Sequence, residues 1–125
     1  MTATVFLALL ASHLLGDWVV QTDEQATNKT RAWGALLRHV ARYHLIMGGL
    51  LLIPVLRDGW PLWRALLTLA VSAASHAFID RRWPVRRLLV AVGSPGFATV
   101  EWGVIAVDQA LHLSILAMLA VALTT

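Results

Sequence analysis

The sequence contains no cysteine, so disulfide bonds, thiolate metal ligands and cysteine nucleophiles are excluded. Charge is also scarce, because only 14% of the residues are Asp, Glu, Lys or Arg, whereas soluble proteins average about 25%. There is no serine in a nucleophile-elbow pattern, no phosphate-cradling glycine loop and no nucleotide-binding fingerprint. The net charge of +3 comes from basic residues scattered around apolar segments, so no nucleic-acid partner is expected.

Apolar residues make up most of the chain. The hydrophobic fraction is 58% and the mean hydropathy is +0.70, values typical of an integral membrane protein. Each of four apolar segments is long enough to cross about 30 Å of hydrocarbon. The first lacks the basic flank of a secretory signal, so we expect it to remain as a span. The prediction is an all-α, antiparallel bundle of four transmembrane helices in a single domain, 1–125, with spans at about 2–20, 33–56, 62–83 and 98–123.

Basic residues in the connections indicate how the bundle lies in the membrane. Two of them, Arg57 and Arg64, lie in or beside the second connection, and neither terminus carries any. By the positive-inside rule, the first and third connections face the cytoplasm and both termini are extracytoplasmic. The other eight lie in or beside those two connections: Lys29, Arg31, Arg38, Arg42, Arg81, Arg82, Arg86 and Arg87.

Tryptophans agree with this orientation, because they fall at segment ends, where aromatic belts of membrane proteins lie. Two are expected at the outer turn, Trp60 and Trp63. Four are expected at the cytoplasmic ends: Trp18, Trp33, Trp83 and Trp102.

Three of the apolar segments each carry one histidine and one aspartate at positions i and i+4. Residues at this spacing lie on one face of a helix, one turn apart. A charged group at the centre of a bilayer costs about 2.5–3.5 kcal/mol, so three such faces need a common reason. The pairs are His13 with Asp17, His76 with Asp80, and Asp108 with His112.

The second segment carries two histidines, His39 and His44. Their five-residue separation places them about 140° apart around a helix, so they do not readily face one point. His39 shares a face with Tyr43 and lies at the better depth, so we rank it above His44. At about 1.5 Å per residue from the tryptophans, the polar groups of all four segments lie roughly 5–15 Å below the cytoplasmic interface. The matched depth predicts one shared site.

Imidazole nitrogen and carboxylate oxygen suit zinc, with iron or manganese as alternatives. A metal position open to water lowers the pKa of that water to about 7 and makes it a nucleophile. Asp17 and Glu101 are the candidate catalytic residues that would accept its proton. The predicted ligands of one or two divalent ions are His13, Asp17, His39, His76, Asp80, Asp108 and His112.

The depth of the site matches the position of an ester or phosphoester of a lipid. We therefore expect a metal-dependent hydrolase that acts on a lipid or lipid-linked substrate at the cytoplasmic leaflet. The alternative is a membrane subunit that binds or translocates metal ions or protons without hydrolysis. A path for translocation would be formed more readily by a homo-oligomer than by a single short chain. A third interpretation remains, because a lone intramembrane histidine often only bonds one helix to another. The loop acids Asp23, Glu24 and Asp58 are expected in solvent, and the arginines as topology signals or contacts to lipid phosphates.

Residues 13–23, HLLGDWVVQTD, resemble the signature of an uncharacterised family of short bacterial and phage integral membrane proteins. The later segments LLRH (36–39), HAFID (76–80) and DQALH (108–112) match its other motifs. The resemblance covers nearly the whole chain and picks out the first of the two histidines of the second segment. It implies a multi-pass protein of the bacterial inner membrane, but no activity, because the function of the family is unknown. More loosely, the residue types are similar to those of small membrane-bound metal-dependent hydrolases.

Overall fold

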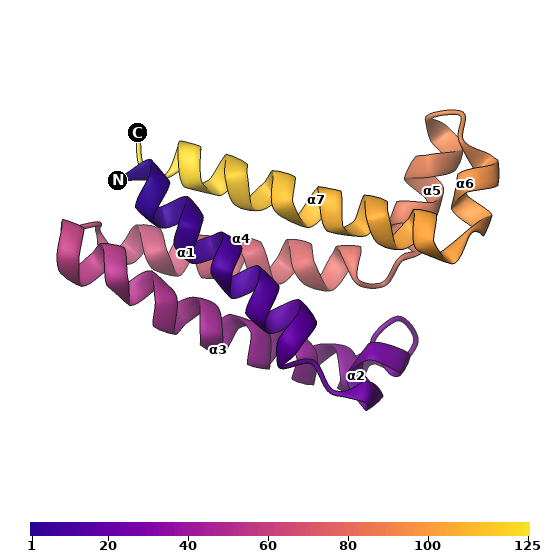
Figure 1. The fold of residues 1–125 in the computed structure, drawn as a ribbon, viewed down its shortest axis with the longest axis horizontal. Coiled ribbons are helices and arrows are strands. Elements are labelled where there is room, and N and C mark those ends of the chain that lie inside the picture. The colour runs from indigo at the N-terminus through magenta and orange to yellow at the C-terminus, as the bar shows by residue number, and fades with distance from the viewer.

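The computed structural model describes residues 1–125 and contains helices but no strand, which confirms the all-α prediction. Its body consists of four long helical segments (Figure 1). Each is long and apolar enough to cross a membrane. They are α1 (Thr2–Leu14) continued by the π-helical turn η1 (Leu15–Val19), α3 (Trp33–Asp58), α4 (Leu62–Ile79) and α7 (Glu101–Ala122).

Three shorter helices lie in the connections: α2 (Asp23–Asn28), α5 (Trp83–Ala91) and α6 (Pro95–Thr99). They gather at one end of the bundle, and the N and C termini lie at the other (Figure 1). At that end the hydroxyls of Thr2 and Thr124 are 2.6 Å apart. The first connection forms α2, whose start is fixed by a capping box in which Thr22 and Gln25 accept each other's backbone N–H groups.

The bundle has an apolar exterior and a partly polar interior. Leu45, Leu56 and Met118 are 76%, 80% and 62% exposed, whereas twelve of the 32 buried residues are polar or charged. Lipid solvates apolar side chains well, but polar groups at that depth must find partners inside the protein. This distribution is the one expected of a protein whose helices contact lipid.

Two apolar clusters pack on either side of the polar interior. One, toward the chain termini, includes Leu9, Met47 and Leu116. The other joins α4, α5, α6 and α7 through residues such as Val85 and Val104. The polar groups are therefore enclosed along the bundle axis by packed apolar side chains.

Three of the predicted spans agree with the helices to within three residues at each end. The third differs, because α4 ends at Ile79 rather than near 83. The chain turns at Asp80, and Arg82 adopts a left-handed backbone with φ of 58°, which a continuing helix does not allow. The stretch that follows forms both α5 and α6.

Five of the six tryptophans are exposed, but Trp60 is buried. Its Nε1 donates a hydrogen bond to the carbonyl oxygen of Leu123 at 2.9 Å. Gly59, at φ 68°, turns the chain out of α3 just before it. Trp60 therefore fixes the turn between α3 and α4 against the C-terminal end of the chain, and does not belong to an exposed aromatic belt.

Candidate metal centre

The change from α-helix to π-helix after α1 places Asp17 in the interior of the bundle. Leu15–Val19 forms a π-helical turn, a feature that is rare and often found at functional sites. Within this turn, a Cβ on Gly16 would lie 2.6 Å from Cδ2 of Tyr43 and 3.2 Å from its Cα. Only glycine permits so close an approach, so η1 and α3 meet here and Asp17 is buried beside His39.

Four side chains converge in the interior: Asp17, His39, His76 and Asp80. Each offers one ligand atom, and these atoms lie within 4.8 Å of one another. His39 Nε2 is 3.1 Å from Asp17 Oδ1 and 2.9 Å from His76 Nε2. Asp80 Oδ2 is 3.2 Å from Nε2 of both histidines. This group could therefore hold a metal ion.

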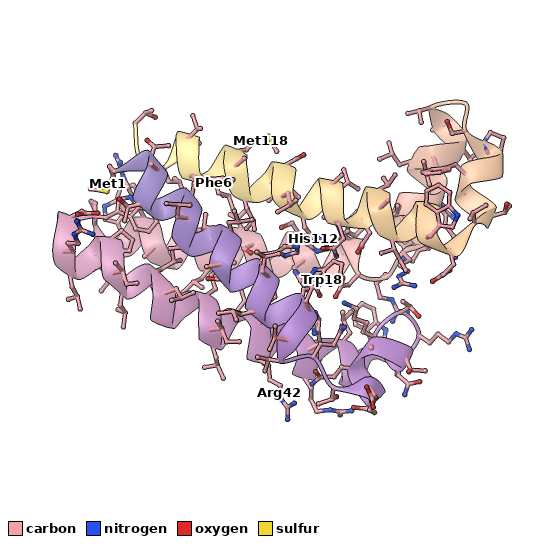
Figure 2. All side chains as sticks on the ribbon, viewed as in Figure 1. Met1, Phe6, Trp18, Arg42, His112 and Met118 are labelled. Atoms are coloured by element: carbon pink, nitrogen blue, oxygen red, sulfur yellow. The ribbon has the colours of Figure 1, made fainter.

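A second group, formed by Asp80, Asp108 and His112, adjoins the first and shares Asp80 with it. Figure 2 shows His112 inside the bundle. Its Nδ1 donates to the backbone carbonyl of Asp108 at 2.9 Å, which leaves the lone pair on Nε2. That Nε2 is 3.9 Å from Asp80 Oδ1.

Three atoms of this second group are buried without a hydrogen-bond partner: His112 Nε2, Asp80 Oδ1 and Asp108 Oδ1. Most buried polar atoms in proteins have such a partner. All three are acceptors, so they do not satisfy one another. A cation bound among them would satisfy all three, and the group therefore fits a metal ion.

Lys29, which follows α2, brings an ammonium group into the site. Its Nζ is 3.0 Å from Asp17 Oδ1, 3.1 Å from Asp80 Oδ2 and 3.4 Å from His39 Nε2. Burial alone would lower the pKa of Lys29, but the carboxylates of Asp80 and Asp17 raise it above its ordinary value, so the group is charged. Nothing in its sequence context distinguishes Lys29 from the other loop cations, so only the structure reveals this role.

A chain of hydrogen bonds runs from His13 through Gln109 to Asp17. Trp18 Nε1–H can only donate, so the atom of Gln109 that it contacts at 3.2 Å is Oε1. His13 Nε2 donates to the same oxygen at 2.9 Å, and His13 Nδ1 accepts from the hydroxyl of Tyr43 at 3.1 Å. The amide nitrogen of Gln109 donates to Asp17 Oδ2 at 2.8 Å. Both nitrogens of His13 are thus occupied, and this expected ligand supports the two groups without belonging to either.

Two other residues considered from the sequence lie outside the two groups. His44 bonds a backbone carbonyl one turn earlier and the hydroxyl of Ser72, at 2.8 and 3.1 Å, in agreement with the ranking of His39 above it. Glu101, a candidate catalytic residue, is exposed and forms ion pairs with Arg82 and Arg86. Its carboxylate is engaged by two guanidinium groups, so it is poorly suited to accept a proton from a metal-bound water.

A cleft of about 230 Å³ borders the site. Three of its wall residues, Asp17, Lys29 and Asp108, are buried site residues. Its outer wall includes Trp18, which is 67% exposed, and Arg82. The cleft therefore extends from the buried site to a part of the surface where apolar and charged side chains, Trp18 and Arg82, lie together.

Charge within the site is unbalanced. Asp17, Asp80 and Asp108 are the buried carboxylates of the chain, and Lys29 is its one buried lysine or arginine. Three carboxylates against one ammonium leave two negative charges when the histidines are neutral. Uncompensated buried charge is costly, so the site calls for one divalent cation or two additional protons.

The model of the family described as "Protein of unknown function (DUF3307)" matches residues 5–125. No curated protein and no solved structure matches the chain. The match extends over nearly the whole sequence but assigns no activity.

Proposed function

We propose that this chain, which belongs to the DUF3307 family of proteins of unknown function, is a membrane-embedded, divalent-metal-dependent hydrolase. Its substrate is a lipid or lipid-linked molecule at the cytoplasmic leaflet. The observation that carries the metal is the pair of ligand groups that share Asp80, in a site where three buried carboxylates face one buried ammonium. Imidazole nitrogen and carboxylate oxygen ligands favour zinc, followed by iron or manganese.

In this proposal the four long helices cross the membrane antiparallel, with the metal site toward the cytoplasm and both termini outside. The concentration of lysine and arginine in the first and third connections supports this orientation. A reporter enzyme fused after Thr125 should lie on the extracytoplasmic side of the membrane. Activity on the cytoplasmic side would reverse the orientation and with it the choice of leaflet.

The first group would hold one ion, and the second group would complete the site or hold a second ion with Asp80 as the shared ligand. A bound ion would polarise the scissile bond and lower the pKa of a coordinated water to about 7. Where Asp108 is not itself a ligand, it is suited to accept the proton of that water, because it lines the cleft and its buried Oδ1 is unpartnered. The ion would supply an activated water for attack on the carbonyl carbon or phosphorus, and as the ester bond broke Asp108 would return the proton to the leaving oxygen.

The cleft favours a substrate with both an apolar and an anionic part. Trp18 presents an exposed aromatic surface at its outer wall, as expected where acyl chains pass. Lys29 and Arg82 line the same cleft and favour a negatively charged group near the scissile bond. A lipid lying in the cytoplasmic leaflet combines these properties.

The alternative function, translocation of metal ions or protons, finds less support. Toward the chain termini the interior is filled by an apolar cluster that includes Leu9, Met47, Leu51 and Leu116. Ions and protons cross proteins along polar groups or water, which such packing excludes. A path through a single chain is therefore not favoured.

The proposal is tested with purified protein and a total cell-lipid extract, with products compared by mass spectrometry. Metal-loaded wild type and His44→Gln should generate the same new products, because His44 lies outside both ligand groups. Chelator-treated wild type and metal-loaded Asp108→Asn should not. Identical lipid profiles for metal-loaded and chelator-treated wild type would refute hydrolysis, and metal uptake into proteoliposomes without lipid turnover would support the alternative.

A further inference from the structure

A second cleft, of about 310 Å³, lies beside the first and shares Arg82 with it. Its walls come from the end of the first connection, the turn after α4, α5 and the start of α7. The fold therefore gathers basic residues that are far apart in the sequence. The charged residues of this arginine cleft are Arg31, Arg81, Arg82, Arg86 and Glu101.

One carboxylate faces four guanidinium groups in the arginine cleft. Glu101 accepts hydrogen bonds from Arg82 through Oε1 and from Arg86 through Oε2, the latter at 2.9 Å. Neither Arg31 nor Arg81 has a carboxylate partner. The cleft thus keeps an excess of three positive charges, which favours a multiply charged anion.

Arg81 supplies a donor that the protein itself does not use. Its guanidinium lies over the ring of Trp33, 4.7 Å from the centroid, in a position set by cation–π stacking. Its Nη1 is buried and has no hydrogen-bond partner. A buried cationic donor without an acceptor is unfavourable, and the planar guanidinium fork matches the oxygens of a phosphate group.

Arg82 connects the arginine cleft with the metal site. It is the one non-glycine residue with a positive φ, a strained conformation that clusters at functional sites. Its side chain lines both the arginine cleft and the cleft that borders Asp17 and Asp108. A group held by Arg82 in one cleft is therefore adjacent to the other.

We propose that the arginine cleft binds a phosphate group, carried by a lipid headgroup or by a free phosphate. The dianion would replace part of the Glu101 contact and accept hydrogen bonds from Arg81 and Arg86. A phosphate-bearing lipid bound there would extend past Arg82 into the neighbouring cleft. Phosphate binding stands without the hydrolase activity, whereas the identification of the bound lipid as the substrate rests on the proposed function.

The test is calorimetric titration of the protein in a neutral maltoside detergent, without added metal. The probes are inorganic phosphate, dioctanoyl phosphatidic acid and, as a control for the acyl chains, dioctanoylglycerol. Arg86→Gln should weaken binding of the phosphate-bearing probes about tenfold, because it removes a charged donor. Arg87→Gln is the matched control, since Arg87 is the next residue of α5, stacks on Trp83 and does not line the arginine cleft. It should change the affinity less than about twofold.

Glu101→Gln gives a result of opposite sign. It removes the one carboxylate that competes with the anion and should tighten binding several-fold, which a loss of structure would not do. Equal affinity for phosphate and phosphatidic acid would assign the arginine cleft to a free phosphate, and tighter binding of phosphatidic acid would assign it to a lipid headgroup.

The proposal is overturned if neither phosphate-bearing probe binds more tightly than dioctanoylglycerol, if Arg86→Gln and Arg87→Gln have equal effects, or if Glu101→Gln weakens binding. The titration involves neither metal nor turnover. Its failure would leave the hydrolase proposal standing, and a failure of hydrolysis would leave phosphate binding intact.

Discussion

Replacement of Lys29 by methionine perturbs the charge balance of the site directly. Methionine keeps much of the side-chain length but removes the ammonium that lies 3.0 Å from Asp17 and 3.1 Å from Asp80. In the metal-free protein, three buried carboxylates then face no buried lysine or arginine. Removal of one partner from a buried ion pair costs about 3–5 kcal/mol, so metal-free Lys29→Met should lose about that much unfolding free energy.

Metal binding should respond in the opposite direction. With neutral histidines and ionised aspartates, the variant presents three uncompensated negative charges to a divalent ion, whereas the wild type presents two. At an effective dielectric constant of about 20, two unit charges 4 Å apart interact by about 4 kcal/mol. Relief of even part of the repulsion between the ammonium and the ion should tighten metal binding at least about tenfold.

Both effects can be measured in one detergent system. Unfolding by SDS titration, followed by tryptophan fluorescence, reports stability with and without zinc, and competition with a chelator reports affinity. Lys29→Met/Asp17→Asn removes one charge of each sign, so it should recover much of the stability lost by the single variant. A metal-free Lys29→Met protein as stable as wild type, or one that binds zinc more weakly, would refute the placement of the ammonium among these carboxylates.

Other substitutions separate the roles of neighbouring residues. Gly16→Ala places a methyl group against the aromatic ring on α3 and should cost about 1–3 kcal/mol in the same unfolding titration. Gly49→Ala, whose Cβ would meet nothing within 4 Å, should cost nothing, and equal losses for the two would contradict the close approach. Gln109→Leu removes the donor to Asp17 and should weaken zinc binding about 10–100-fold in chelator competition; an unchanged affinity would contradict its supporting role. His112→Gln should reduce the metal content if the second group holds an ion of its own, and an unchanged stoichiometry would restrict binding to the first group.

Much of the candidate site could be predicted from spacing and depth. A straight helix has a fixed rise and rotation per residue, so the pair His76 and Asp80 must share a face, and His39 must point away from His44. When the tryptophans mark the membrane interface, the same rise per residue predicts that the polar groups of all four segments lie at a similar depth. These features are local to each helix, and the structure brings Asp80 into both ligand groups as the shared member.

The remaining features depend on contacts that no single segment determines. Lys29 reaches the site because α2 folds back against the bundle, and a lysine in a polar loop looks the same whether or not it does so. The two ring nitrogens of His13 are hydrogen-bonded to Gln109 and Tyr43, which lie 96 and 30 residues away in the sequence. Trp60 is buried by a contact with the last residues of the chain, and composition does not reveal that contact.

Metal content is the most direct test of the central claim. Wild type, His44→Gln and His39→Gln/His76→Gln are each loaded with zinc, iron(II) or manganese, freed of unbound ions and analysed by plasma mass spectrometry. Wild type and His44→Gln should retain about one or two ions per chain with one of these metals, and the double variant should retain none. Wild-type protein that retains no metal after loading with each of the three ions would contradict the assignment of this buried cluster as a metal centre.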